Sequence, residues 1–330
     1  MLDLIIIGSG PAGLSAALAA KELALSYLVL ERGTIADTVH LFPLRRKLFS
    51  TANELELEAG AFAADYKPSR EELLKHYVDL ATREGINIRT GEEAHRIEPI
   101  NECLLVGTSR GEYRARAVLA ALGGFGRPRT LNVPGEGLPC VTYRFVEPLS
   151  FRDKKVLVVG GGNSAAEAAL SLAEAGTRVT LALRRPALGP HGNGGAPPRT
   201  AAIKPWVLAP LEEKIAAGQI RLICSAEVRK IEPGRVLLRL HNTSADGELE
   251  SVECDQVFAL IGADPDTRLL ETAGALIGDD RHPIYDPETY ETTVPGLYVA
   301  GHLTRERHIK NAVVTSRRVV RNIAAQLVHT

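Results

Sequence analysis

The sequence contains one pattern twice: a short apolar run, a glycine-rich hexapeptide and an alanine-rich run. In the first copy these are residues 2–7, 8–13 and 14–20, which predict a strand, a tight turn and a helix. In such a unit the first glycine permits a sharp turn, the second lets the backbone approach a pyrophosphate, and the third lets the helix pack closely on the strand. The free N–H groups at the helix start then face the phosphates. The pattern predicts a dinucleotide site formed by Gly8, Ser9, Gly10, Pro11, Ala12 and Gly13.

The end of the next predicted strand indicates which nucleotide this site prefers. Residues 26–30 form a second apolar run that ends in Glu31, about eighteen residues after the last glycine of the turn. A carboxylate at this place accepts hydrogen bonds from a ribose 2′-hydroxyl. We therefore expect the first site to bind an unphosphorylated adenosine.

The second copy ends differently. Residues 155–172 repeat the apolar run, the turn and the alanine-rich run, and the following strand at 178–183 ends in two arginines where the first copy has a glutamate. Guanidinium groups bind a 2′-phosphate in a forked geometry, so we expect NADPH here, with a pair of solvated surface arginines as the alternative. The predicted contacts are Gly160, Gly162, Asn163, Ser164, Ala165, Arg184 and Arg185.

Three further apolar runs end in glycine. Residues 117–122 stop at Gly123, which is typical of an interior parallel strand with a ligand near its carboxyl end. Residues 255–262 form another buried strand that ends in Gly262. An apolar strand that ends at Gly301 cannot stand alone, so we expect it to join the sheet of the first fingerprint. The first domain would then be discontinuous in sequence.

The expected fold class is α/β, with two Rossmann-like three-layer (ββα) dinucleotide-binding domains, the second inserted into the first. A chain of 330 residues with 45% hydrophobic content is long enough for about two buried cores. We place the first domain at residues 1–122 and 256–330 and the second at 123–255. Residues 186–200, rich in glycine and proline, are predicted to form a mobile loop.

Charge and cysteine content exclude several classes of function. The 39 basic and 40 acidic residues nearly cancel, so no general basic field attracts nucleic acid or an anionic membrane. The predicted strand begins next to Met1 and no apolar run is long enough to span a bilayer, so we expect a soluble, cytoplasmic protein. The cysteines are too far apart for a C-x-x-C pair or a metal site: Cys103, Cys140, Cys224 and Cys254.

Taken together, these motifs resemble the low-molecular-weight thioredoxin reductase superfamily over nearly the whole chain. The resemblance rests on the first fingerprint with Glu31, the second with Arg184 and Arg185, and the closing residues 293–301. It implies FAD bound by the N- and C-terminal segments, NADPH bound by the inserted domain, and an active form that is commonly a homodimer.

Within that superfamily the chain is most similar to the bacillithiol-disulfide reductases. The similarity lies at residues 31–33, 41–50, 132–136 and above all 203–206. Like that branch, the chain lacks the C-x-x-C dithiol, since the corresponding stretch is residues 140–145 with a single cysteine.

The resemblance also implies cofactor contacts outside the fingerprints. The chain departs from the branch in three respects, one of which is a loop after Arg185 that is longer and richer in glycine. The branch typically has cysteine where this chain has Ala12, and the aspartate that usually binds the flavin ribityl chain is His302 here. The further candidates for cofactor binding are Arg32, His40, Phe49, Ala94, Ala121, Gly123, Gly262, Gly301, His302, Asn311 and Ala312.

Two residues are candidates for catalysis. Glu167, on the first turn of the second fingerprint's helix, matches a family glutamate near the nicotinamide or flavin, and favourable interaction with the helix dipole explains it equally well. Lys310 opens the last predicted helix, whose positive end is placed to stabilise negative charge on a reduced flavin near N1.

The expected function is an NADPH-dependent FAD reductase that passes hydride to the flavin and electrons on to a small molecule or a small protein. By resemblance the acceptor is a low-molecular-weight disulfide. A ferredoxin, a quinone or oxygen stay open as acceptors, and a non-catalytic redox sensor stays open as a different class. A flavin monooxygenase is disfavoured because no F-x-G-x-x-x-H-x-x-x-W/Y stretch precedes the second fingerprint.

Overall fold

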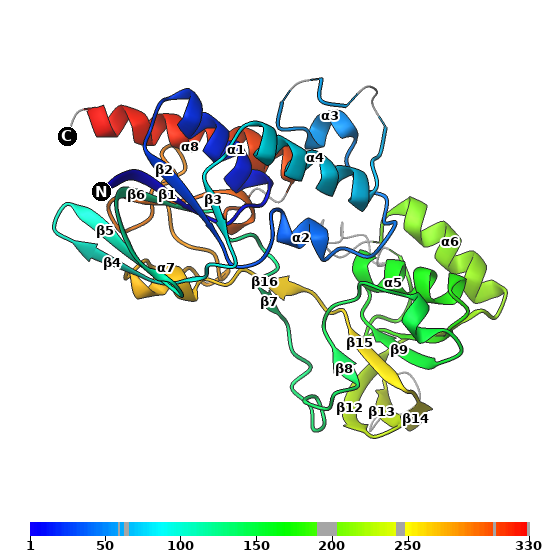
Figure 1. Ribbon diagram of the computed structural model, residues 1–330. Helices are drawn as coiled ribbons and strands as arrows, with labels where there is room; N and C mark the ends of the chain where they lie inside the picture. The colour runs from blue at the N-terminus through cyan, green and yellow to red at the C-terminus, as the bar shows by residue number, and fades with distance from the viewer. Residues whose placement is uncertain (59, 63–65, 190–202, 242–247, 306–307, 329–330) are drawn as a thin grey trace. The chain divides into compact units, whose positions relative to one another are not determined.

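The chain folds into two compact units. The computed structural model describes residues 1–58, 60–62, 66–189, 203–241, 248–305 and 308–328 (Figure 1). Unit 1 comprises Met1–Arg127 and Asp264–Thr330, and unit 2 comprises Pro128–Ala263. The chain passes between them at the short strands β7 (Arg127–Pro128) and β16 (Ala263–Asp264). Most of the loop predicted at residues 186–200 lies outside the described residues.

Unit 1 is built on a seven-stranded sheet with the order β3-β2-β1-β6-β5-β4, and β17 also pairs with β6. The strands are β1 (Leu2–Ile7), β2 (Tyr27–Glu31), β3 (Ile88–Thr90), β4 (Ala94–Ile100), β5 (Cys103–Thr108), β6 (Gly111–Ala120) and β17 (Leu297–Val299). The start of β6 pairs antiparallel with β5, and its end pairs parallel with both β1 and β17. The prediction that the run ending at Gly301 joins the first sheet is confirmed.

Helices cover one face of this sheet. They are α1 (Pro11–Glu22), α2 (Asp37–His40), α3 (Ala52–Leu55), α4 (Arg70–Arg83) and α8 (Ile309–Val328), and α1 and α8 lie side by side (Figure 1). Leu4 and Ile6 of β1 pack in the core with α1, α4 and α8. Ile5 and Ile7 point to the other face, where they pack with residues of β4, β5 and α7 (Arg268–Thr272). Burial on both faces explains why β1 is apolar throughout.

Helix α4 begins with a capping box formed by Ser69 and Glu72. The Ser69 N–H donates to the Glu72 carboxylate at 2.7 Å, and the Glu72 N–H donates back to Ser69 Oγ at 3.3 Å. Two N–H groups that have no partner inside the helix are therefore satisfied by side chains. Arg70 is the first residue of this helix.

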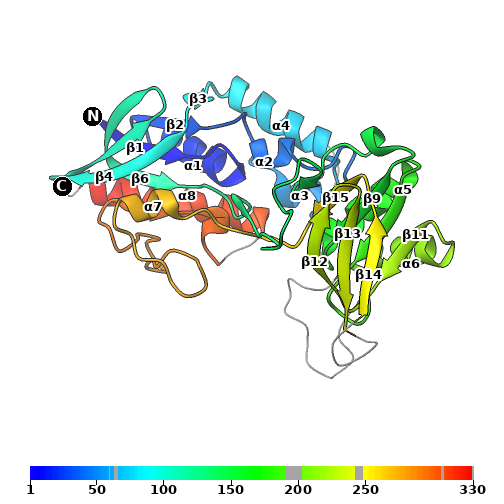
Figure 2. The same ribbon diagram turned by 90° about the horizontal axis from the view of Figure 1, so that it is seen from below.

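Unit 2 repeats the layered arrangement. A five-stranded parallel sheet has the order β11-β10-β9-β15-β8. A three-stranded antiparallel sheet, β12-β13-β14 (Figure 2), shares an apolar core with it. The elements are β8 (Val141–Thr142), η1 (Leu149–Phe151), β9 (Lys155–Val159), α5 (Asn163–Glu174), β10 (Arg178–Ala182), α6 (Pro205–Ala216), β11 (Ile220–Ile223), β12 (Ala226–Glu232), β13 (Arg235–Leu240), β14 (Glu248–Glu253) and β15 (Gln256–Ala259).

The predicted α/β class with two Rossmann-like units is confirmed, but the chain changes units at other positions than predicted. The sequence prediction put the second crossing at 255/256, whereas β15 lies beyond it and pairs with β9 in unit 2. An apolar run that ends in glycine fits either sheet, so composition alone could not assign it.

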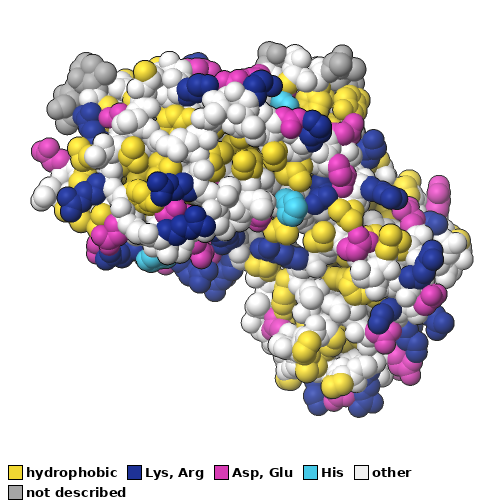
Figure 3. All heavy atoms as spheres, in the orientation of Figure 1, with side chains coloured by type: hydrophobic (Ala, Val, Ile, Leu, Met, Phe, Trp, Pro, Cys, Tyr) yellow, Lys and Arg dark blue, Asp and Glu magenta, His cyan; other side chains and the backbone are white. Residues whose placement is uncertain are grey.

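The surface of the protein carries the mixture of charges that the sequence predicts. Basic and acidic side chains are interspersed on the face that Figure 3 shows. Among the described residues, no helix has the length and apolar character needed to cross a membrane, and no cluster of potential metal ligands occurs there.

Candidate functional site

The first glycine turn has the geometry that a bound pyrophosphate requires. Gly8 has φ +106°, and a Cβ atom there would lie 2.4 Å from the carbonyl oxygen of Ala121. A Cβ at Gly13 would lie 1.8 Å from the carbonyl oxygen of Gly8. At Gly10, in contrast, no described residue other than its two chain neighbours has an atom within 4 Å of the Cβ position. Two glycines are thus required by the fold itself, whereas the middle one leaves open space in front of helix α1.

Glu31 has a structural role besides the ribose contact that the sequence predicts for it. It is only 7% exposed, and one carboxylate oxygen accepts from the Ser9 N–H at 2.8 Å and the Ser9 hydroxyl at 3.0 Å. The other oxygen accepts from the Gly33 N–H at 2.8 Å. The end of β2 is therefore tied to the glycine turn. A carboxylate has about four acceptor positions, so Glu31 keeps the capacity to accept from a ribose.

Next to this turn, unit 1 encloses a cavity of about 440 Å³. Strand ends, the start of α1 and the start of α8 all contribute to its wall. The predicted site residues that line it are Gly8, Gly10, Pro11, Ala12, Glu31, Arg32, Ala94, Ala121, Gly123, Gly301, His302 and Ala312. Residues from positions as distant as 8 and 312 are thus brought together at the carboxyl ends of the strands, where open α/β sheets bind ligands.

The closing turn, η2 (Gly301–Leu303), packs directly on the fingerprint. Gly301 has φ +66°, and a Cβ there would lie 2.9 Å from the Cβ of Ala12. His302 lines the cavity with its ring edge-on to Phe125, at 5.7 Å between centroids. A Cβ at Gly124 would come within 2.9 Å of the His302 Cβ. His302, which replaces the expected aspartate, is therefore closely packed at the cavity wall.

Six residues predicted for the FAD site do not line the cavity: Ser9 and Gly13 of the fingerprint, His40, Phe49, Lys310 and Asn311. Lys310 is exposed, and its Nζ lies 3.8 Å from Glu54. Asn311 is exposed, and neither His40 nor Phe49 lines the cavity. The start of α8 still contributes Ile309 and Ala312 to the wall. The Lys310 side chain therefore points toward α3, and the role of the α8 N-terminus in stabilising negative charge on a flavin stays a prediction.

The cavity wall also contains residues that the sequence did not single out. Val39 and Phe42 come from the long segment after β2, and Phe125 follows the glycine pair after β6. Leu269 and Thr272 come from α7, which follows the second crossing. The sequence signal for Val39 and Phe42 was the unusual length of the segment after β2 that contains them, because long loops are often functional.

The second fingerprint in unit 2 has the same geometry as the first. Gly160 has φ +146°, and a Cβ there would lie 2.4 Å from the carbonyl oxygen of Leu260. At Gly162, the N-cap of α5, no described residue other than its two chain neighbours has an atom within 4 Å of the Cβ position. Asn163 Oδ1 accepts from the Lys204 N–H at 2.8 Å, Ser164 is exposed, and Ala165 is buried. The open position is again the second glycine of the G-x-G-x-x-G/A motif, which is Gly162 here.

The two arginines after β10 lie differently. Arg184 is exposed. The Arg185 guanidinium lies against the glycine turn, since a Cβ at Gly161 would be 2.8 Å from its Nη2. Glu167 is half-buried on the first turn of α5, and Gly262, at φ +100°, accepts from the Arg129 N–H at 3.0 Å. The turn and at least one guanidinium are therefore adjacent, as a 2′-phosphate site needs.

Comparisons with known proteins agree with this architecture. The chain is 35% identical over 300 residues to "Bacilliredoxin reductase Bdr" of Bacillus subtilis (strain 168), covering 90% of this chain and 88% of that protein. Its structure is similar to "Bacillithiol Disulfide Reductase Bdr (YpdA)" from Staphylococcus aureus, with a TM-score of 0.89, 29% identity and 98% of each chain covered. The corresponding protein from Bacillus cereus has a TM-score of 0.87 and 29% identity, covering 98% of this chain and 99% of that chain.

A family match covers most of the chain as well. Residues 5–301 match the family described as "Pyridine nucleotide-disulphide oxidoreductase", a span that includes both fingerprints and Gly301. The resemblance inferred from the sequence is thereby confirmed, and the protein is an oxidoreductase. The chain belongs to the pyridine nucleotide-disulphide oxidoreductase family.

Proposed function

We propose that this protein is an NADPH-dependent FAD reductase that delivers two electrons to a low-molecular-weight disulfide. The observation that carries the proposal is the pair of matching glycine turns with open middle positions, one joined to Glu31 and the other adjacent to Arg185. Two relatives named for bacillithiol disulfide support a substrate of that class.

In this proposal unit 1 binds FAD and unit 2 binds NADPH. The turn at Gly10 and the start of α1 hold the pyrophosphate of FAD, and Glu31 binds its ribose. The turn at Gly162 holds the pyrophosphate of NADPH, and Arg184 with Arg185 binds its 2′-phosphate. FAD, when bound, accepts hydride from NADPH and carries two electrons to the acceptor. The protein aligns the partners and excludes water.

Assembly and location complete the proposal. We expect a homodimer, as the family resemblance implies. We also expect the protein to act in the cytoplasm, where thiols are kept reduced and a disulfide reductase has its substrate. Sedimentation of the purified protein measures the first expectation.

The identity of the electron acceptor distinguishes this function from its alternatives. With NADPH in excess, we expect bacillithiol disulfide to support faster NADPH oxidation than oxidised ferredoxin, a quinone or oxygen. The measurement is the initial rate of NADPH consumption with each acceptor at equal concentration. Faster turnover with ferredoxin or a quinone would reassign the acceptor, and no turnover with any acceptor would favour a redox sensor.

A cysteine-free variant serves as the control for the route of the electrons. No cysteine is among the residues that line the described cavity. Burial, followed by the neighbouring Cys140 and Asp255, raises the pKa of Cys254 to about 11, and burial raises the pKa of Cys224, so neither thiol is a ready nucleophile. Replacing all four cysteines should leave turnover with the disulfide unchanged. Loss of disulfide reduction in Cys140→Ser alone, with dye reduction intact, would make Cys140 the substrate-facing thiol.

A further inference from the structure

We infer that Arg70, a residue outside the cavity, is a positioning residue that holds one wall of the cavity and thereby sets the affinity for flavin. The inference rests on the proposed function only in that FAD occupies this cavity. Arg70 was not among the predicted site residues, and it does not line the cavity. Its influence would act through residues 37–42, which contribute Asp37, Thr38, Val39 and Phe42 to the wall.

The position of Arg70 is unfavourable for a cation in two ways. The residue is only 7% exposed, and charged side chains are rarely buried unless they are paired. It is also the first residue of α4, where the positive end of the helix dipole opposes a positive charge. A cation held at such a place needs specific partners, and these partners identify what it holds.

The partners of Arg70 belong to the segment that forms the cavity wall. Its Nε donates to the carbonyl oxygen of His40 at 3.1 Å, and its Nη2 donates to the same oxygen. The Arg70 backbone N–H donates to the carbonyl oxygen of Arg46 at 2.8 Å. His40 is the last residue of α2, and carbonyl groups at a helix end have no partner within the helix. Arg70 thus binds the chain on both sides of Phe42.

Two further contacts keep this arrangement in register. Arg70 Nη1 pairs with Glu71 at 3.0 Å, and the same Glu71 oxygen accepts from the Arg45 N–H at 3.1 Å. The guanidinium of Arg46 lies 4.9 Å from the ring centroid of Phe42 and 5.1 Å from that of Phe49. The predicted site residues His40 and Phe49 therefore act indirectly, one through its carbonyl group and the other by supporting Arg46.

Loss of the guanidinium should loosen this wall and release the flavin. In Arg70→Met, the His40 carbonyl loses two donors, and we expect flavin to leave the holoprotein about tenfold faster than from the unaltered protein. Arg70→Lys keeps one donor and should restore part of the difference. The measurement is the growth of free-flavin fluorescence after dilution of the holoprotein, together with the visible absorbance bands of the bound flavin, which should shift in Arg70→Met and less in Arg70→Lys.

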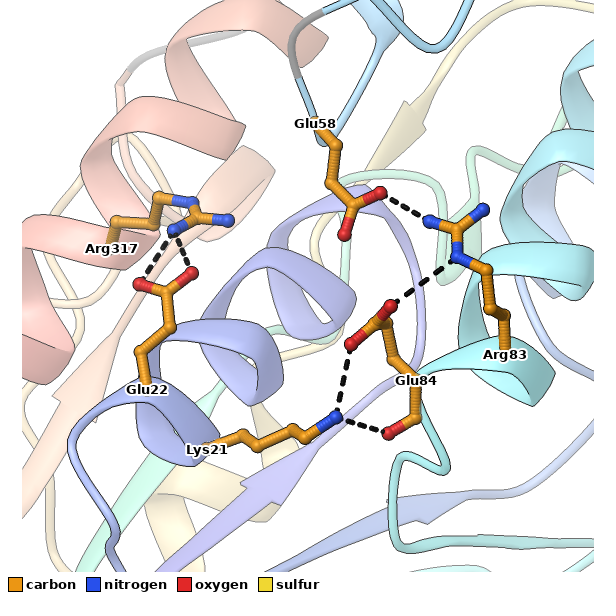
Figure 4. Close-up of polar contacts among 6 residues, drawn as sticks. All are labelled: Lys21, Glu22, Glu58, Arg83, Glu84 and Arg317. Atoms are coloured by element: carbon orange, nitrogen blue, oxygen red, sulfur yellow. Dashed lines mark hydrogen bonds and ion pairs between the residues drawn. The ribbon is translucent and has the colours of Figure 1, made fainter.

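The matched control is Arg83→Met at the other end of the same helix. Figure 4 shows Arg83 with Glu58 and Glu84, and none of these three residues lines the cavity. Its side chain is 57% exposed, and exposed ion pairs contribute little, so its flavin release should change by less than about twofold. Equal acceleration in both variants would mean that any weakening of α4 releases flavin, and it would overturn the inference.

The remaining outcomes are also decisive. A wild-type release rate in Arg70→Met contradicts the inference. If Arg70→Met does not accumulate as folded protein, Arg70→Lys and Arg46→Gln decide in its place, and wild-type release and spectra in both would overturn it. If the unaltered protein binds no FAD, the proposed function fails, whereas FAD binding that is insensitive to Arg70 refutes the inference alone.

Discussion

A valine at position 10 is expected to give a folded protein that purifies without flavin. Gly10 has φ −70° and ψ −176°, an extended conformation that any residue adopts, and no described residue other than its two chain neighbours has an atom within 4 Å of its Cβ position. The valine side chain would project into the space that the cofactor pyrophosphate occupies. The loss should therefore concern binding and not folding. The ratio of flavin to protein absorbance, together with the thermal unfolding midpoint of the apoprotein, measures both.

Two other glycines supply the controls. Gly162→Val blocks the equivalent position of the second fingerprint, so this variant should keep its flavin but fail to be reduced by NADPH. Gly13→Ala places a methyl group 1.8 Å from the carbonyl oxygen of Gly8 and should destabilise the protein itself. A Gly10→Val protein with full flavin content and normal stability would contradict the assignment of the first site.

Replacement of both Arg184 and Arg185 by alanine should weaken the binding of NADPH at least tenfold and leave the binding of NADH nearly unchanged. Each charge-assisted hydrogen bond to the 2′-phosphate contributes roughly 1.5–3 kcal/mol, and 1.4 kcal/mol corresponds to a factor of ten. NADH has no 2′-phosphate, so its binding should lose little free energy. The measurement is the nucleotide concentration that gives half-maximal flavin reduction, with each nucleotide in turn.

The same strand offers the control for this prediction. Arg178, at the start of β10, is exposed and lies at the opposite end of the strand from the turn. Arg178→Ala should leave both nucleotides unaffected. Equal losses for NADPH and NADH in the double variant would mean that Arg184 and Arg185 recognise a part common to both nucleotides.

The features that sequence predicted correctly are local. Each glycine turn and the apolar strand before Gly301 were recognised from residues close in sequence and from the backbone conformations that these residues allow. Glycine at position 13, for example, is required because a Cβ there would lie 1.8 Å from the carbonyl oxygen of Gly8, five residues earlier. Such requirements can be read from a short stretch of chain.

The features that sequence missed depend on distant segments. Phe42 and Thr272 reach the cavity from segments far apart in the chain, and no periodic pattern marks either. The contact of the Lys310 side chain with Glu54 could not be predicted either, because the direction in which a helix turns its first residues depends on how it packs. Arg70 was not singled out from the sequence, because its partner, the carbonyl group of His40, is a backbone atom thirty residues away.

The most direct test of the central claim is a sequential stopped-flow experiment without oxygen. The holoprotein is first mixed with NADPH and then with bacillithiol disulfide, while flavin absorbance is followed and free thiol is assayed at the end. The account predicts that NADPH bleaches the flavin, that the disulfide restores its colour within the same experiment, and that two thiols appear for each flavin reoxidised. A flavin that NADPH does not bleach, or one that stays bleached with the disulfide and is reoxidised by ferredoxin or a quinone, would contradict it.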